Sequence, residues 1–211
     1  MNWVDIVLLV LLLLSVIIGA KKGLIRELTA FFVVVVAAIV SITYIDQFAV
    51  WVHNQLGGSP LISAFLSFVV LLAAAYAAFK LLAMLFYKIA QVKSQPHRRD
   101  QMGGALVGFL RGWLIVGFIT FLAFLLPMPQ GFYTAFESSF FGPTVAKTLP
   151  LIYDSTGMFH PTKPTFLQQM EKTLMLQSGP TTNSSDLEES RIQVHRVLYQ
   201  LERHFITGSG T

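Results

Sequence analysis

The chain has 211 residues, of which 54% are hydrophobic and only 12% are charged, whereas ordinary soluble domains carry roughly 25% charged residues. A soluble protein of this length could not bury so much apolar surface, and without cysteine the chain can form neither disulfides nor thiolate metal sites. The net charge of +4 is divided among short loops and a tail, so it indicates membrane topology and no nucleic-acid partner.

Four apolar stretches are long enough to cross a bilayer core, which needs about 20 residues. They are residues 4–20, 28–45, 61–87 and 102–128. Lys21 and Lys22 follow the first stretch where a signal peptide would be cleaved, so we expect this helix to be retained. The sequence predicts an all-α, polytopic membrane protein, with a transmembrane domain of four helices at 1–129 and a mostly helical, partly irregular extracytoplasmic tail at 130–211.

The orientation follows from the basic residues between these stretches. The first and third connections are basic, with Lys21, Lys22 and Arg26 in one and Lys88, Lys93, Arg98 and Arg99 in the other. Residues 46–60 contain no Lys or Arg. Because basic loops are retained in the cytoplasm, we expect the N-terminus and the tail to lie outside it.

The first stretch carries small residues on one face. Ser15, Gly19 and Gly23 recur at four-residue spacing, and Asp5 lies near the outer end on roughly the same side. Such a stripe allows another helix to approach closely in lipid. We interpret Asp5 as marking the membrane interface, with a proton-carrying role as the alternative.

The second and third stretches offer few polar side chains. The second has only Ser41 and Thr43, which is typical of a lipid-exposed helix. The third has Lys80 close to Lys88, so the Lys80 ammonium can extend to the cytoplasmic headgroups.

The fourth stretch has glycine at strict four-residue spacing, at Gly104, Gly108 and Gly112, and Arg111 lies on the same face. Four residues advance a helix by about 400°, so these glycines form a nearly straight row. Together with Ser15 and its two glycine partners, they predict a helix-packing groove.

Three interpretations of Arg111 follow from its position in an apolar helix. The favoured one is an interfacial anchor whose guanidinium extends to the cytoplasmic surface. The alternatives are a pair with a buried acid such as Glu27 and a position on a water-filled path. A central arginine costs roughly 2.5 to 3.5 kcal/mol on insertion, which the surrounding Leu, Ile, Phe and Val residues offset.

The tail changes composition after Pro129. Residues 131–164 are rich in Gly, Pro, Thr and aromatics, which predicts irregular structure with short helices. A modest helix is predicted at 164–177, a linker at 178–185 and an amphipathic helix at 186–206. Ser185 and Glu188 have the spacing of a capping box at the start of that helix. Its apolar seam suits either a partner helix or packing on the same chain, and it consists of Leu187, Val194, Leu198, Leu201 and Phe205.

The sequence predicts no catalytic residue, metal site or cofactor. The five histidines are scattered over loops and tail, without a carboxylate at ligand spacing. The glycines of the fourth stretch lie within an apolar helix and follow no strand, so they do not form a phosphate-binding loop. These absences argue against an enzyme.

Two groups of residues resemble the motifs of a known family. The first helix opens with Trp3 and Asp5 and ends in a GxKxGxxRE turn made by Gly19, Lys21, Lys22, Gly23, Arg26 and Glu27. The fourth is entered through an RD…GxxxGxxRG block made by Arg99, Asp100, Gly104, Gly108, Arg111 and Gly112. Over roughly residues 1–129 the chain resembles the colicin V production protein (CvpA) family. The resemblance implies a bacterial inner-membrane protein needed for production or export of a peptide toxin and for envelope upkeep, without a catalytic residue.

Two functions are compatible with these features. The first is an accessory protein that acts through helix-helix assembly, with Asp5, Arg26, Glu27, Asp100 and Arg111 as its candidate functional polar residues. The second is a homo-oligomeric channel built on the fourth helix, with Arg111 lining the pore. In addition to the lipid bilayer, the expected partners are further copies of the chain or other envelope and export proteins. They would bind through the glycine face and the C-terminal amphipathic helix.

Overall fold

The computed structural model describes residues 2–57, 59–89, 98–159, 164–176 and 184–205. Every regular element in these ranges is a helix, so the predicted all-α class is confirmed. The elements are α1 (Trp3–Lys22), α2 (Leu24–Leu56), α3 (Pro60–Ile89), α4 (Arg98–Leu125), α5 (Gln130–Glu137), α6 (Gly142–Ala146), α7 (Thr148–Ser155), the 3₁₀ helix η1 (Thr156–Phe159), α8 (Phe166–Leu176) and α9 (Ser184–Phe205).

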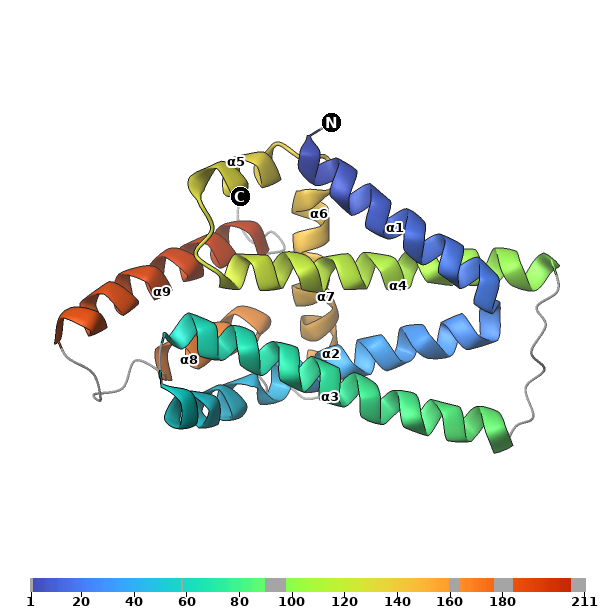
Figure 1. Cartoon of the computed structure of the whole chain (residues 1–211), viewed down its shortest axis with the longest axis horizontal. Coiled ribbons are helices and arrows are strands. Elements are labelled where there is room, and N and C mark those ends of the chain that lie inside the picture. The colour runs from blue at the N-terminus through green and yellow to red at the C-terminus, as the bar shows by residue number, and fades with distance from the viewer. Residues whose placement is uncertain (1, 58, 90–97, 160–163, 177–183, 206–211) are drawn as a thin grey trace.

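Within the described residues, α1 to α4 are the helices long and apolar enough to cross a membrane. They alternate in direction and pack mainly in two pairs, α1 with α4 and α2 with α3 (Figure 1). The tail helices α8 and α9 gather at the end of the bundle where α4 finishes and α2 turns into α3 (Figure 1). The predicted polytopic membrane protein is confirmed.

α2 is longer than the predicted stretch 28–45, because it begins directly after Gly23 and continues to Leu56. The helix contacts the tail both within that stretch and just beyond it. Within it, the Gln169 amide donates a hydrogen bond to the Thr43 carbonyl at 3.2 Å, and just beyond it the Lys172 ammonium lies 2.8 Å from an Asp46 carboxylate oxygen. Hydropathy alone could not detect this extension, because its packing surface is supplied by a distant helix.

The prediction that the second stretch is a plain lipid-exposed helix is wrong. One face of α2 is buried from Val33 to Val52, including Ala38, Ile42 and Ile45. These positions recur every three or four residues, as expected for a helix face that packs on neighbours. The opposite face is apolar too, so the sequence offers no contrast that would reveal the buried one.

The tail is more helical than predicted between 131 and 164, where it forms α5, α6, α7 and η1. Residues 178–183 of the predicted linker and the side chains of Ser185, Glu188 and Leu187 lie outside the described part. The seam of α9 packs on the same chain, since Val194, Leu201 and Phe205 are buried in the common core.

α6 and α7 pack directly on α4 within the stretch that is long and apolar enough to cross a membrane. The Trp113 indole donates a hydrogen bond to the Thr148 hydroxyl at 2.8 Å, and Gly117 lies against Val145 and Leu149. Residues on both sides of Pro129 therefore contribute to one hydrophobic core.

Candidate functional site: the meeting point of two glycine motifs

The small residues of α1 and α4 lie against each other. A Cβ atom added at Gly19 would clash with the Gly104 carbonyl oxygen and lie 2.8 Å from the Gly108 Cα. A Cβ added at Gly108 would lie 2.8 Å from the Ser15 carbonyl oxygen and 2.9 Å from the Gly19 Cα. Because these neighbours are backbone atoms, side chains cannot move aside to admit a larger residue.

Ser15 completes this contact with a hydrogen bond. Its hydroxyl donates to the Gly108 carbonyl at 2.8 Å in a buried position, and a Cβ at Gly112 would lie 2.8 Å from the Ser15 oxygen. The structure thus brings the two predicted stripes together, with α1 of the same chain occupying the glycine face of α4.

The turn between α1 and α2 is joined to the start of α4. Gly23 adopts a φ of 81°, which glycine tolerates without strain. The next residue, Leu24, donates its backbone N–H to an Asp100 carboxylate oxygen at 2.8 Å. An acid at this place satisfies a donor at the N-terminus of α2 and lies at the positive end of its dipole.

Beyond this turn, Glu27 and Arg111 form a buried ion pair. An Arg111 terminal nitrogen lies 2.9 Å from a Glu27 carboxylate oxygen, with the two side chains 9% and 0% exposed. The Lys22 ammonium, which is 46% exposed, lies 3.9 Å from the other Glu27 oxygen. Among the described residues, the Arg111 Nε has no hydrogen-bond partner.

This geometry corrects the favoured interpretation of Arg111 as an interfacial anchor. The guanidinium faces Glu27, so Arg111 is paired with a buried acid, which was the alternative interpretation. Gly23 makes this possible, because the turn there directs α2 back along α4 with Glu27 in its first turn. Removing one member of a buried pair typically costs about 3 to 5 kcal/mol, since the other charge is left without compensation.

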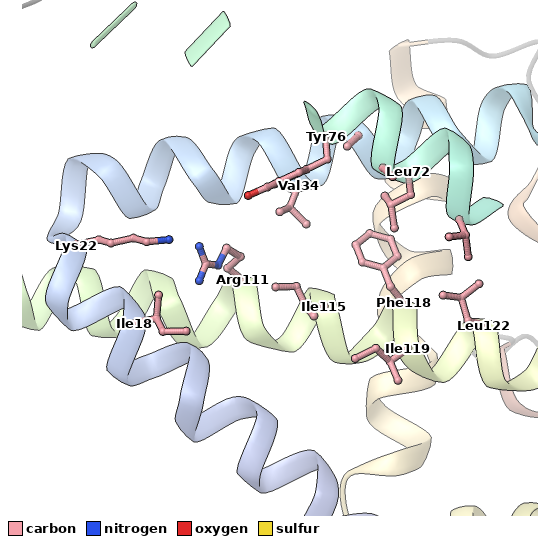
Figure 2. A pocket seen from close by; sticks show the side chains of 13 residues that line it. Ile18, Lys22, Val34, Leu72, Tyr76, Arg111, Ile115, Phe118, Ile119 and Leu122 are labelled. Carbon is pink, nitrogen blue, oxygen red and sulfur yellow. The ribbon is translucent and has the colours of Figure 1, made fainter. Parts of the chain in front are cut away.

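A cleft of about 540 Å³ begins beside this pair and continues between the four long helices. Lys22, Arg111 and Tyr76 are its polar lining residues, and the rest of the lining is apolar. Figure 2 shows Lys22 and Arg111 close together at one end, with Phe118 and Leu122 toward the other.

The structure places Asp5 away from this cluster, at the opposite end of α1. One of its oxygens accepts the Asn2 N–H at 3.1 Å as part of a capping box. The other accepts the N–H groups of Phe140 and Phe141 at 2.8 and 3.2 Å. Asp5 is 1% exposed, and through these bonds its carboxylate fastens the tail to the start of α1.

Arg26, the remaining candidate, lies at the edge of the cluster. Its side chain is half-buried, and its backbone carbonyl accepts a hydrogen bond from the Tyr87 hydroxyl at 3.3 Å. Through that bond the first turn of α2 is connected to the last turns of α3.

A second charged cluster connects α5 and α9. One Glu137 carboxylate oxygen lies 2.8 Å from an Arg203 nitrogen and 3.4 Å from the His204 Nε2. Burial lowers the pKa of His204, the nearby Glu137 charge opposes this effect, and the Arg203 charge adds to it. His204 is therefore held in the neutral form by its surroundings.

The sequence of this chain matches one known protein family. The sequence profile described as colicin V production protein matches residues 4–150. The chain belongs to this family. No curated protein and no solved structure matches it.

The predicted resemblance is confirmed, and it extends further than the motifs indicated. The match runs past Pro129 through α5 and α6 into α7. The matched region therefore includes α6, which packs on α4.

Sequence reasoning missed the part that Lys22, Tyr76 and Asn2 play in these sites. Lys22 occupies the variable position between Lys21 and Gly23 of the GxKxGxxRE motif, but it stands five residues before Glu27 across a glycine turn, which was an available signal. Tyr76 carried no signal, because its role depends on how α3 lies relative to α4. Asn2 stands three residues before Asp5, which is the spacing of a helix-capping pair.

Proposed function

We propose that this protein is a non-catalytic accessory protein of the bacterial inner membrane that supports production or export of a peptide toxin and maintenance of the envelope. Family membership carries this proposal, because the matched residues 4–150 contain the motifs of α1, α2 and α4 that meet at the Glu27–Arg111 pair. The described side chains form no group of three acids or histidines that could hold a metal ion.

We propose further that the protein acts through helix assembly. The α1–α4 contact and the buried pair hold a fixed bundle, to which Asp5 fastens the tail. Because α1 fills the glycine face, we assign partner binding to the outer face of α9. Ile192 and Tyr199 on that face are 59% and 58% exposed.

The proposed topology has the N-terminus and the tail outside the cytoplasm. The basic α1–α2 turn and the basic connection to α4 support this orientation. Single cysteines at Asn54 and Gln95 test it with a membrane-impermeant maleimide on spheroplasts. We expect labelling at Asn54 only, and labelling at Gln95 only would reverse the topology.

The functional test uses a strain that produces a colicin V-type toxin and lacks this protein. Toxin export and resistance to detergent should fall in the deletion strain and return with the wild-type chain. The α9 double variant Ile192→Ser and Tyr199→Ser should reach normal membrane abundance and fail to complement. Full complementation by that variant would exclude the α9 face as the partner surface, and normal export in the deletion strain would refute the accessory role.

The channel alternative requires a wet path and an oligomer contact. Pairing of Arg111 with Glu27 and occupation of the glycine face by α1 both weigh against it. Ion flux into liposomes containing the purified protein tests this alternative. Selective flux that disappears in Arg111→Ala would support the channel.

A further inference from the structure

The cleft beside Arg111 has properties that the accessory role does not use. It is lined by side chains from α1, α2, α3 and α4, all of which can cross a membrane. Its volume of about 540 Å³ lies within the range of roughly 300 to 1,000 Å³ found for pockets that hold small molecules.

One end of this cleft carries excess positive charge. Lys22 and Arg111 are two cations facing a single carboxylate, that of Glu27. The Arg111 Nε has no hydrogen-bond partner among the described residues, and Figure 2 shows the Tyr76 hydroxyl directed toward the same end. An anion placed here would gain charge-assisted hydrogen bonds from groups already held in position.

The apolar part of the cleft has the length of one bilayer leaflet. From Arg111 to Leu122 it extends roughly 17 Å along α4 at 1.5 Å per residue, and half of a hydrocarbon core is about 15 Å. Ile115, Ile119 and Leu122 line this part, and Ile115 and Ile119 are 36% and 45% exposed. A hydrocarbon chain could therefore enter from the bilayer without passing through water.

We propose that this cleft binds one anionic phospholipid from the leaflet next to Lys22. Its phosphate lies against Lys22 and Arg111, and one acyl chain follows α4 toward Leu122. Basic pockets between transmembrane helices recognise anionic headgroups in this way, and the guanidinium fork and the ammonium both suit phosphate. A zwitterionic lipid would bring an additional cation to an end that is already positive.

Native mass spectrometry of the full-length protein in detergent tests this proposal. The protein is incubated with dioleoylphosphatidylglycerol or with dioleoylphosphatidylcholine, and the fraction carrying one lipid is measured. Lys22→Gln should lower retention of phosphatidylglycerol about fivefold. This factor corresponds to the binding free energy of about 1 kcal/mol that one basic residue contributes near an anionic lipid. The matched control is Lys21→Gln, because Lys21 is exposed and does not line the cleft.

A second pair of variants tests the apolar part without altering a charge. Ala73 lines the cleft, and Ala74, which is also exposed, does not. Ala73→Phe should strongly reduce retention of phosphatidylglycerol, and Ala74→Phe should leave it unchanged. Excess inorganic phosphate should displace little lipid, because it supplies no chain.

Three results would overturn the proposal. Equal retention of the two lipids would mean that the positive end of the cleft does not distinguish an anionic headgroup from a zwitterionic one. Equal effects of Lys21→Gln and Lys22→Gln would place the charge effect outside the cleft. Displacement by phosphate together with no effect of Ala73→Phe would reveal a site for a free anion. Binding is measured on the purified protein, so none of these results depends on whether the chain supports toxin export.

Discussion

At the end of the bundle near Gly23, α1 and α4 approach until backbone atoms touch, whereas near Phe124 the helices are held apart by large aromatic rings. The first region has the Gly19–Gly108 contact and the Glu27–Arg111 pair. In the second, Phe124 makes edge contacts with Phe136 and Phe205 at ring-centroid distances of 5.0 and 5.3 Å.

The two regions should differ in tolerance because their contacts differ in kind. Backbone atoms cannot change rotamer, and a buried charge cannot lose its partner without a desolvation penalty. Aromatic side chains can shift and repack, so apolar substitutions of similar volume are tolerated best there. We therefore expect small changes in side-chain size or charge to act most strongly at the glycine end.

The largest effect is expected from Glu27→Ala, which leaves Arg111 buried without its acid. A loss of about 3 to 5 kcal/mol in the free energy of unfolding is typical of such a change, and it should appear as low membrane abundance and a lower Tm in detergent. Glu171→Ala, at an exposed position on α8, is the control.

Replacing both charges, with Glu27→Leu and Arg111→Met, should recover much of that loss, because no unpaired charge remains. If Glu27→Ala behaves like Glu171→Ala, the pair does not stabilise the bundle. The two ends of the bundle would then differ only in how closely their helices approach.

The next largest effect is expected from Gly108→Ala, which alters only the close approach of α1 and α4. The new methyl would meet backbone atoms of α1 at 2.8 and 2.9 Å, so the helices must separate, at a cost of about 1 to 3 kcal/mol. The matched control is Gly117→Ala, where the nearest atoms lie at 3.6 Å.

Alanine is a better helix former than glycine by about 1 kcal/mol, so Gly117→Ala should be neutral or stabilising. Thermal unfolding of both purified variants decides the matter. Equal Tm values would show that the row at Gly108 has no special role.

A smaller effect is expected at the tail, from Asp5→Asn. The amide oxygen can still accept the N–H groups of Phe140 and Phe141 without the charge that strengthens such bonds. The amide nitrogen cannot accept the Asn2 N–H of the capping box, so the expected loss is about 1 to 2 kcal/mol. Hydrogen exchange should rise in the peptide that contains Phe140 and stay unchanged around Gly108. Faster exchange at both places would mean that the two ends are not independent.

The sequence was sufficient to predict the four long helices, because hydropathy over about 20 residues is a strong local signal. It also placed the glycine stripes, since four-residue spacing fixes a helix face. It could not say which helix covers that face. The choice between α1 and a second copy depends on the turn at Gly23, whose φ of 81° carries no hydropathy signal.

Arg111 and α2 were misinterpreted for a related reason. Spacing shows that Arg111 must avoid lipid, but anchoring and pairing satisfy that condition equally until the path of α2 is known. The buried face of α2 was hidden because its residues are apolar on all sides. Contacts between distant segments, such as that of Gly117 with α6 and α7, produce no periodic pattern in the sequence, so they could not be predicted from it.

The smallest effect is expected at His204, where the aromatic end carries a titratable group. Burial lowers the pKa of His204, so the unfolded chain takes up a proton near the ordinary value of about 6.5 before the folded one does. Stability is then fully present above that value and is lost as the pH falls through it toward the lower folded pKa. Thermal unfolding in detergent between about pH 7.5 and about pH 5.5 should show a small decrease in Tm, with α9 exchanging its amides first.

The variant His204→Gln should flatten part of this pH dependence, whereas His195→Gln, at an exposed position on the same helix, should not. The Glu137 charge attracts the protonated ring and Arg203 repels it, so Glu137→Gln should make the decrease steeper. An unchanged profile in His204→Gln would mean that protonation elsewhere controls α9. In that case the aromatic end would be held by its rings alone, and it would differ still more from the glycine end with its buried ion pair.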